Sequence, residues 1–290
     1  MRIAYRNIVD GIDSGNITCS TADPNFPVSN IQDQRLSMYT LAGTTAEFVF
    51  DFTGHGYKIN TVALLGHNIS SSASIYIYFN YINDWANPAV TQVLTWNKDV
   101  IMKFLDTPVY VGTAEIENAN ELTSAVVPID NLTTESGNLL ITEAGDSLIR
   151  QDKYAFAKVK IVNNVAVQLG RVWMGDYLTI SPSSLLDFKV YKKRSDINIY
   201  GKDRQKFSIP GVSWRAINLK FPPTDNTMLS SILDWFDMVG LYRSFIFCNF
   251  DTLRGYALVE PLYCSISSDI GFTHQQSMKF SYELNLEEDK

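Results

Sequence analysis

Apolar and polar residues alternate along most of this chain, and this alternation restricts it mainly to β-strands. The alternation is clear at 47–52, 74–82 and 157–162, and it is longest at 278–287. One side of the strand predicted at 74–82 is lined by Ile75, Ile77, Phe79 and Tyr81. Such strands bury one face and leave the other in water, as in antiparallel sheets. Aromatic residues make up 12% of the chain, which also favours strands.

One segment has helical spacing instead. Its apolar residues recur every three or four positions: Leu229, Ile232, Leu233, Phe236 and Val239. Thr224 or Asp225 can cap the start of this helix, and Gly240 can end it in a left-handed turn. We therefore predict one long helix at about 225–239 in a mainly β protein, with no βαβ rhythm and no internal repeat.

The length of the chain indicates two domains. With 290 residues, 46% of them hydrophobic, it exceeds the commonest size of a single domain. The stretch SPSS at 181–184 suits a junction. The predicted fold is therefore mainly β, with two antiparallel β-sandwich domains. The first covers residues 1–185, and the second covers residues 186–290 and contains the helix.

Opposite charges are separated along the chain. Residues 106–149 hold eight acids and no Lys or Arg, whereas residues 189–206 hold seven bases and two acids. Two interpretations are open. Either both segments are simply solvated, or the acidic insert of one copy contacts the basic segment of another, head to tail, so that copies close into a ring. The subunit-interface candidates are Glu115, Glu117, Glu121, Lys192, Lys193, Arg194, Lys202 and Arg204.

Residues of the kinds used in catalytic and cofactor sites form no recognisable set. The chain has no phosphate-binding P-loop, no dinucleotide fingerprint and no G-x-S-x-G sequence. The three histidines, His55, His67 and His274, are not spaced as zinc ligands. We therefore expect no enzyme activity and no cofactor, while catalysis by an unrecognised site stays open as an alternative.

Charge and cysteine content limit the partners and the compartment. The net charge of −7 argues against a nucleic-acid-binding protein. No stretch reaches the ~18 apolar residues that cross a bilayer, so we expect no membrane insertion. The N-terminus lacks the apolar core of a secretory signal. Cys19, Cys248 and Cys264 are too few for a disulfide framework, which favours synthesis in a reducing cytoplasm.

Two tryptophans stand beside polar turn residues. Trp85 lies in YINDWANPA and Trp96 lies in LTWNKD. An exposed aromatic ring beside Asn and Asp suits a sugar-binding loop, because the ring can stack on a sugar. Alternatively, such a tryptophan closes the end of a β-sandwich. Trp173 and Trp235 are predicted to be structural.

The sequence Gly66-His67-Asn68 lies between two predicted strands. One strand ends at Gly66, and the next begins after three serines. His67 and Asn68 are therefore expected in a loop, where the Asn bonds the backbone and the His ties a neighbouring strand. We favour this structural role, and we keep both residues as sugar-binding candidates together with Trp85 and Trp96.

Several stretches together resemble a galactose-binding (discoidin-like) jelly-roll, namely 25–40, 46–52, 59–78 and 155–177. In that family the chain enters through a Pro-x-x-Asn-hydrophobic-x-Asp turn, here residues 27–33, and a strand ends in V-x-L-x-G-H-N, here residues 62–68. Versions found in bacteriophage virion proteins also carry G-R-hydrophobic-aromatic-x-G-acid, here residues 170–176. The acidic insert at about 106–149 is longer than a minimal jelly-roll allows.

The rest of the chain resembles the sandwich of phage distal-tail and tail-hub proteins, through residues 214–221, 240–251 and 255–267. This resemblance implies a structural virion protein, made in the cytoplasm of a host bacterium. Its second domain would form a ring at the tail tip with other tail proteins. Its first domain would project outward as decoration or as a contact with host-surface glycans.

The resemblance also raises two further questions. Galactose-binding-type sandwiches often hold calcium, for which Asn30 and Asp33 could supply oxygen ligands, although these residues serve equally well as turn formers. Two other functions also stay open. One is a carbohydrate-binding adhesin without a ring-forming role, and the other is an enzyme such as a polysaccharide depolymerase.

Overall fold

The computed structural model describes residues 1–112, 115–118, 129–131, 148–151, 153–180, 187–200, 206–224, 226–248, 250–251, 256–257, 260–275 and 279–289. The chain divides into two compact units. We call Arg6–Tyr177 the large unit, and Met1–Tyr5 together with Leu178–Lys290 the helical unit. The sequence analysis placed the second domain at 186–290, whereas the helical unit begins at Leu178 and also includes the first five residues.

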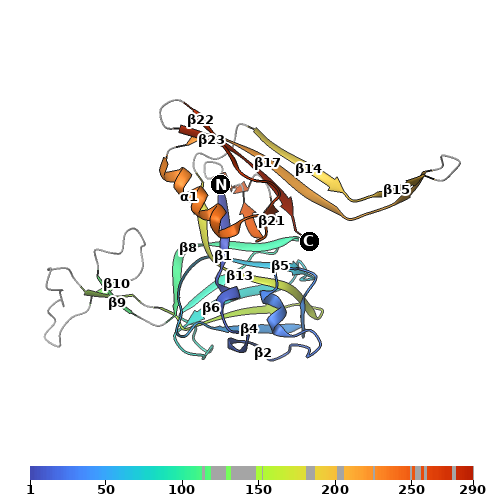
Figure 1. Ribbon diagram of the computed structural model, residues 1–290. Helices are drawn as coiled ribbons and strands as arrows, with labels where there is room; N and C mark the ends of the chain where they lie inside the picture. Colours follow the sequence, from blue (N-terminus) through green and yellow to red (C-terminus); the bar gives the residue numbers. More distant parts are fainter. Residues whose placement is uncertain are drawn as a thin grey trace. The chain divides into compact units, whose positions relative to one another are not determined.

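The large unit contains a five-stranded antiparallel sheet (Figure 1). Its strands lie in the order β2 (Ile17–Cys19), β4 (Thr45–Asp51), β12 (Phe156–Val162), β6 (Ser74–Asn80) and β7 (Val90–Val93). Its inward positions carry large apolar residues such as Phe48, Ile77 and Val159, all fully buried. The outward positions carry polar and aromatic residues, as the alternation in the sequence predicts.

A second layer packs on the inner face of this sheet (Figure 1). It consists of β3 (Thr40–Ala42), β13 (Val167–Thr179), β5 (Gly56–His67) and β8 (Val100–Gly112). The buried residues of both layers form one continuous hydrophobic core. Three short 3-10 helices precede or border these strands: Ile8–Gly11, Ser14–Asn16 and Val28–Gln32. The arrangement is a β-sandwich.

The acidic insert contributes a small sheet of its own. The described strands are β10 (Ile129–Asn131), β11 (Leu148–Gln151) and β9 (Glu115–Asn118), in that order and antiparallel. β9 and β10 therefore form the two edges of this sheet.

The helical unit is built on an antiparallel sheet. Its strands lie in the order β14 (Asp187–Arg194), β17 (Ser213–Thr224), β23 (Lys279–Glu288), β21 (Leu262–Ile266), β18 (Phe245–Cys248) and β1 (Arg2–Asn7), and β22 (Gly271–Gln275) pairs with β23. Two further hairpins pair β15 (Ile197–Tyr200) with β16 (Lys206–Ile209), and β19 (Phe250–Asp251) with β20 (Tyr256–Ala257). β14 forms an edge of the sheet, where it pairs with β17 along its length.

One α-helix, α1 (Asn226–Val239), occurs among the described residues, where the spacing of apolar residues predicts it. Trp235 is fully buried on its inner face, and its ring meets Phe245 of β18 edge-on at 5.2 Å. The helix ends at Gly240, whose φ of 57° lies in the left-handed region that favours glycine. Together with the antiparallel sheets, this single helix confirms the predicted fold class.

Candidate functional site

Trp85 lies over the open, outward face of the five-stranded sheet. The ammonium group of Lys158 lies 4.9 Å from the centre of the Trp85 ring and 5.4 Å from the centre of the Tyr78 ring. Both distances suit a cation–π contact. Lys158 points outward from β12 yet is only 6% exposed. The two aromatic rings therefore shield a charged side chain on the solvent side of the sheet.

The neighbouring row of outward side chains carries an ion pair. Sheet register places Lys160 of β12 opposite Glu47 of β4 and Tyr76 of β6. The ammonium group of Lys160 donates to Glu47 at 2.9 Å, and that of Lys158 donates to the other oxygen of the same carboxylate at 3.4 Å. The rings of Tyr76 and Tyr78 lie nearly parallel, 6.0 Å apart. We call Glu47, Tyr76, Tyr78, Trp85, Lys158 and Lys160 the aromatic platform.

Electrostatics keep the ion pair charged. Burial raises the pKa of Glu47, but the Lys160 hydrogen bond and the charges of both lysines outweigh this effect, so the pKa lies below its ordinary value. The hydrogen bond to Glu47 and its negative charge raise the pKa of Lys160. Both groups are therefore ionised at neutral pH.

Hydrogen bonds fix the loop that carries Trp85. The Asn80 side chain accepts from the Tyr81 amide at 3.0 Å and donates to the Asp84 carbonyl at 2.5 Å. The Trp85 indole N–H donates to Asn83 at 2.8 Å. Because this N–H is already bonded, Trp85 offers its ring rather than its donor to a partner.

His67 is the last residue of β5, one position beyond the predicted end of the strand at Gly66, and Asn68 follows it directly. The Asn68 side chain donates to the Ala166 carbonyl at 2.9 Å and accepts from the Gln168 amide at 2.8 Å. It thus bonds the backbone in the way that the backbone of a neighbouring strand does. Nδ1 of His67 accepts from the Ile69 amide at 3.3 Å. Burial is the main cause of a lowered His67 pKa. These contacts fit the structural interpretation of both residues.

Trp96 lies beside the same loop and not on the aromatic platform. Its indole N–H donates to the Ile69 carbonyl at 2.7 Å, while 37% of the residue is exposed. Ile69 also donates its amide to His67. The structure thus brings together Trp96 and the His67–Asn68 loop, and it places Trp85 in a different environment, with Lys158.

The two residues considered for calcium are engaged with protein groups. Asp33 forms a two-point ion pair with Arg35, at 2.7 and 3.0 Å, which lowers the pKa of Asp33 to about 2. The Asn30 side-chain amide donates to the Tyr39 carbonyl at 2.9 Å. In the parts of the chain that the structure describes, no three His, Cys, Asp or Glu residues are grouped as metal ligands.

The G-R-hydrophobic-aromatic-x-G-acid sequence has a structural explanation. Arg171 is 1% exposed, forms an ion pair with Asp10 and donates to the Gln32 carbonyl at 3.2 Å. A Cβ at Gly170 would lie 2.7 Å from the Leu36 carbonyl oxygen. A Cβ at Gly175 would lie 1.8 Å from the Arg6 carbonyl oxygen.

The aromatic and the acidic residue of this sequence also contact their surroundings. Trp173 is buried, and Asp176 accepts from the Tyr177 amide at 2.8 Å and from the Asn60 side chain. Arg171 and Asp176 thus join β13 to neighbouring segments of the large unit.

The basic interface candidates on β14 are exposed. Lys192, Lys193 and Arg194 all lie on this edge strand of the helical unit. Two of them have partners in the same unit: Lys193 pairs with Glu287 at 2.6 Å, and Arg194 pairs with Asp196 at 3.3 Å. Lys202, Arg204 and Glu121 lie outside the described residues, whereas Glu115 and Glu117 belong to β9.

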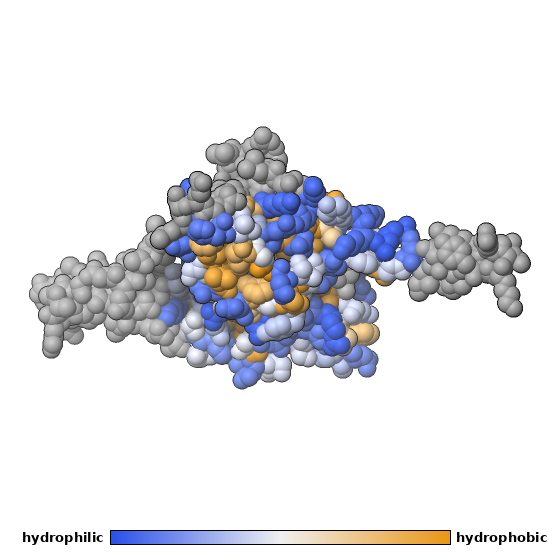
Figure 2. Space-filling model, turned by 45° about the horizontal axis from the view of Figure 1, so that its top comes forward, coloured by the Kyte–Doolittle hydropathy of each residue, from blue (hydrophilic) through white to orange (hydrophobic). Residues whose placement is uncertain are grey.

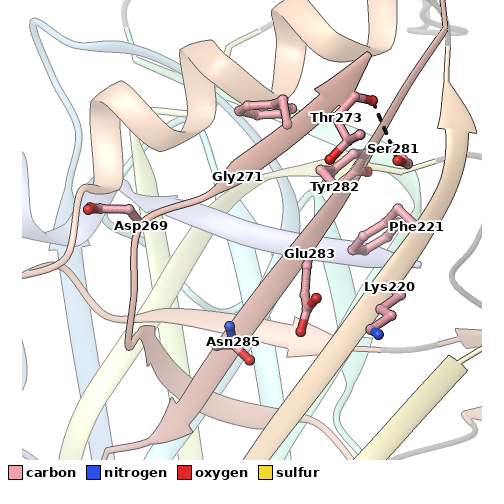
Figure 3. A pocket seen from close by; sticks show the side chains of 10 residues that line it. Lys220, Phe221, Asp269, Gly271, Thr273, Ser281, Tyr282, Glu283 and Asn285 are labelled. Atoms are coloured by element: carbon pink, nitrogen blue, oxygen red, sulfur yellow. Dashed lines mark hydrogen bonds between the residues drawn. The ribbon is translucent and has the colours of Figure 1, made fainter. Parts of the chain in front are cut away.

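A hollow of about 600 Å³ lies on the sheet of the helical unit (Figure 3). Lys220 of β17 and Glu283 and Asn285 of β23 line it side by side. Asn218 donates to Glu283 and, at 2.7 Å, to Asn285. The Ser281 hydroxyl donates to the Thr273 carbonyl at 3.5 Å. The hollow thus offers polar groups to a partner.

Comparisons with known proteins give only distant similarities. No protein-family model and no curated protein matches the chain. A fucose-binding module of Streptococcus pneumoniae is 10% identical with a TM-score of 0.35, covering 59% of this chain and 95% of the module. A chain from the virion of a native gene transfer agent particle is 14% identical with a TM-score of 0.26, covering 39% of this chain and 85% of that chain. At these values, neither similarity assigns a function.

Sequence reasoning singled out Trp85 but missed the rest of the aromatic platform. Tyr76 and Tyr78 occupy the outward positions of β6, where water-exposed polar residues are the norm. The alternation in the sequence already places Tyr76 and Tyr78 at successive outward positions, and this was the signal that could have revealed the platform. The prediction that Tyr81 lines the same side of this strand as Ile75, Ile77 and Phe79 is wrong, because β6 ends at Asn80. The ring of Tyr81 instead packs on that of Tyr154, with ring centres 4.8 Å apart.

Proposed function

We propose that this protein is a structural component of a bacteriophage virion at the tail tip, where it assembles into a ring with other tail proteins. It works without enzymatic activity, and its large unit contributes to contact with the host surface. The observation that carries this proposal is the exposed edge strand β14. An edge strand presents unpaired backbone groups along one side and can therefore pair with another chain.

The side chains of β14 suit a partner that is partly apolar and acidic. Val190 and Tyr191 are each 49% exposed, on opposite faces of the strand. Lys189 and Lys192 flank them and are also exposed. Such an edge repels a second copy of itself, because its bases would face bases. It is compatible with an acidic segment, and residues 106–149 of another copy carry eight acids and no bases.

Pairing between two different surfaces has a geometric consequence. A contact in which each copy uses its β14 edge on one side and its acidic insert on the other is heterologous, and heterologous contacts generate rings or filaments. Hydrophobic residues also gather in a patch on one face of the protein (Figure 2). Leu233, Met238 and Leu241, in or just after α1, are each at least 39% exposed. Apolar surface of this kind supports burial against neighbours in an assembly.

Charge reversal tests the contact. We expect Lys189→Glu/Lys192→Glu and, separately, Glu115→Lys/Glu117→Lys to weaken assembly, measured by light scattering and electron microscopy. A mixture of the two variants should assemble again, because each reversed surface then meets its opposite. Lys98→Glu, on an exposed loop of the large unit, is the control. Assembly that is unaffected by these reversals and by salt would overturn the β14 contact.

A carbohydrate-binding adhesin without a ring-forming role is the second candidate, and the aromatic platform favours it. Trp85 and Tyr78 are aromatic rings on an outward sheet face. Binding to a glycan array by a protein that remains monomeric at all concentrations would favour this function over the structural one. Binding should then fall in a folded Trp85→Ala variant.

A further inference from the structure

We propose that the aromatic platform on the five-stranded sheet is a glycan-binding site that accommodates a neutral sugar with two adjacent hydroxyl groups. The site lies within the large unit and uses none of the residues of the β14 contact. Its binding activity is therefore independent of whether the protein forms a ring.

The rings supply the stacking surface. Tyr76 and Tyr78 are half-buried, and their rings stack along β6 with planes 19° apart. The apolar face of a sugar ring packs on an aromatic face with little loss of side-chain entropy, because each tyrosine is fixed by the sheet. Trp85 lies beside them, with its ring 6.5 Å from that of Tyr78.

The ion pair supplies the polar recognition. Glu47 and Lys160 lie in the same cross-strand row as Tyr76. The carboxylate accepts from one sugar hydroxyl while the ammonium donates to the next, since their polar atoms are 2.9 Å apart. About one third of the Lys160 side chain and of the Glu47 side chain, 34% each, is exposed to such a partner.

The exposed charges of the platform, one ammonium group and one carboxylate, favour a neutral sugar. The Glu47 carboxylate sits between two ammonium groups, and Lys158 is shielded by Tyr78 and Trp85. Lys160 is thus the cation that a ligand meets first, and Glu47 already neutralises it. A sugar carboxylate placed there would approach Glu47 as well, and this repulsion disfavours an anionic sugar.

The site is formed before any ligand binds. Three strands hold Glu47, Lys160 and Tyr76 in register, and the hydrogen bonds of residues 80–85 hold the Trp85 loop. Lys158 is a positioning residue, because it contacts the rings and the carboxylate and is itself buried. Preorganisation of this kind reduces the entropy lost on binding.

The experiment is a glycan array of neutral and anionic bacterial-surface saccharides, followed by solution titration of the strongest binder with the full-length protein. We expect a neutral saccharide to bind, and Tyr76→Ala or Glu47→Gln to weaken it about tenfold or more. Tyr242→Ala, which removes a 71% exposed tyrosine in the helical unit, is the matched control and should leave binding unchanged. Far-UV circular dichroism checks that each variant is folded.

A second measurement tests the positioning role of Lys158. In Lys158→Met we expect weaker binding together with a shift in tryptophan fluorescence, because the cation leaves the Trp85 ring. The same fluorescence should not change in Lys160→Met. The proposal is overturned if no saccharide binds, if anionic saccharides alone bind, or if binding in folded Tyr76→Ala and Glu47→Gln equals that of the unaltered protein. If the unaltered protein binds a saccharide but does not assemble, the proposed ring is contradicted and this glycan site still stands.

Discussion

The guanidinium group of Arg171 lies 2.5 Å from the carboxylate of Asp10, although 161 residues separate them in the sequence. The pair joins β13 to the 3-10 helix Ile8–Gly11, and Arg171 is almost completely buried. A buried guanidinium that loses its counter-charge keeps its desolvation cost. The pair thus links two distant parts of the sequence within the large unit.

Asp10→Ala should therefore destabilise the large unit. We expect the free energy of unfolding to fall by about 2–3 kcal/mol, since a hydrogen bond to a charged group is lost. Urea unfolding measures the change, and Asp13→Ala, on a nearby exposed position, is the control. An equal effect of the two substitutions would contradict the structural role of the pair.

Gly170→Ala should also destabilise this unit, for steric reasons. The added Cβ would lie 2.7 Å from the Leu36 carbonyl oxygen, which is backbone and cannot move aside cheaply. Overpacking of this kind costs about 1–3 kcal/mol, which thermal unfolding would detect. Gly15→Ala, where a Cβ meets nothing within 4 Å, should have little effect.

The ion pair between Asp33 and Arg35 predicts a specific pH dependence. The pKa of Asp33 falls from 3.8 to about 2, chiefly because Arg35 donates to it. A depressed carboxyl pKa stabilises the fold above pH 3.8, and this contribution disappears as the pH falls towards about 2. The difference in unfolding free energy between the protein and Asp33→Asn should thus shrink over that range. This difference should be small, because Arg35 is largely exposed and water screens the pair. A difference in unfolding free energy that stays constant over this pH range would contradict the lowered pKa of Asp33.

Asn68→Ala should cost stability without affecting glycan binding. The substitution removes a donor to Ala166 and an acceptor for Gln168, so we expect a loss of about 1–2 kcal/mol in unfolding free energy. Asn68→Asp keeps the acceptor for Gln168 but places a carboxylate oxygen against the Ala166 carbonyl, so it should also lose stability. Calorimetry gives the stability, and titration with the bound saccharide gives the affinity. Weaker saccharide binding by a stable Asn68→Ala variant would indicate that the glycan site lies at the loop of Asn68 and not on the aromatic platform.

The three thiols should differ in reactivity. Burial raises the pKa of Cys248 to about 11 and raises that of the fully buried Cys264 as well, whereas Cys19 is partly exposed. Since the thiolate is the reactive form, a thiol reagent at pH 8 should modify Cys248 about a hundredfold more slowly than an unshifted cysteine. Mass spectrometry of the labelled peptides measures each rate. Equal rates for Cys19 and Cys248 would contradict the burial of Cys248.

Local periodicity was sufficient to predict the strands and the helix. The alternation at 278–287 gives β23, and the spacing of apolar residues at 229–239 gives α1. Of the apolar residues that predicted this helix, Ile232 and Val239 are buried, whereas Leu233 is 40% exposed and Trp235 is the third buried residue. Each of these patterns lies within one element, so the side chains alone specify it. The end of β6 at Asn80 was not predictable in this way, because it depends on hydrogen bonds with the loop that follows.

The candidate site could be predicted only in part, because it depends on strand pairing. Trp85 was identified from its polar neighbours, but Lys158 and Glu47 are separated by 111 residues and meet through the register of β12 and β4. The same limit applies to Lys193, whose partner Glu287 is 94 residues away. Register depends on long-range packing, which no short window of sequence contains.

The two faces of the five-stranded sheet respond differently to mutation. The inward residues, such as Phe48, Ile77 and Val159, share a crowded interior in which each substitution disturbs the others. The outward residues of the same strands lie outside this interior, so Tyr76 or Lys160 can change while the interior stays intact. Evolution can therefore alter what this surface recognises, residue by residue, on an unchanged scaffold, and diversification among related proteins should concentrate at these outward positions.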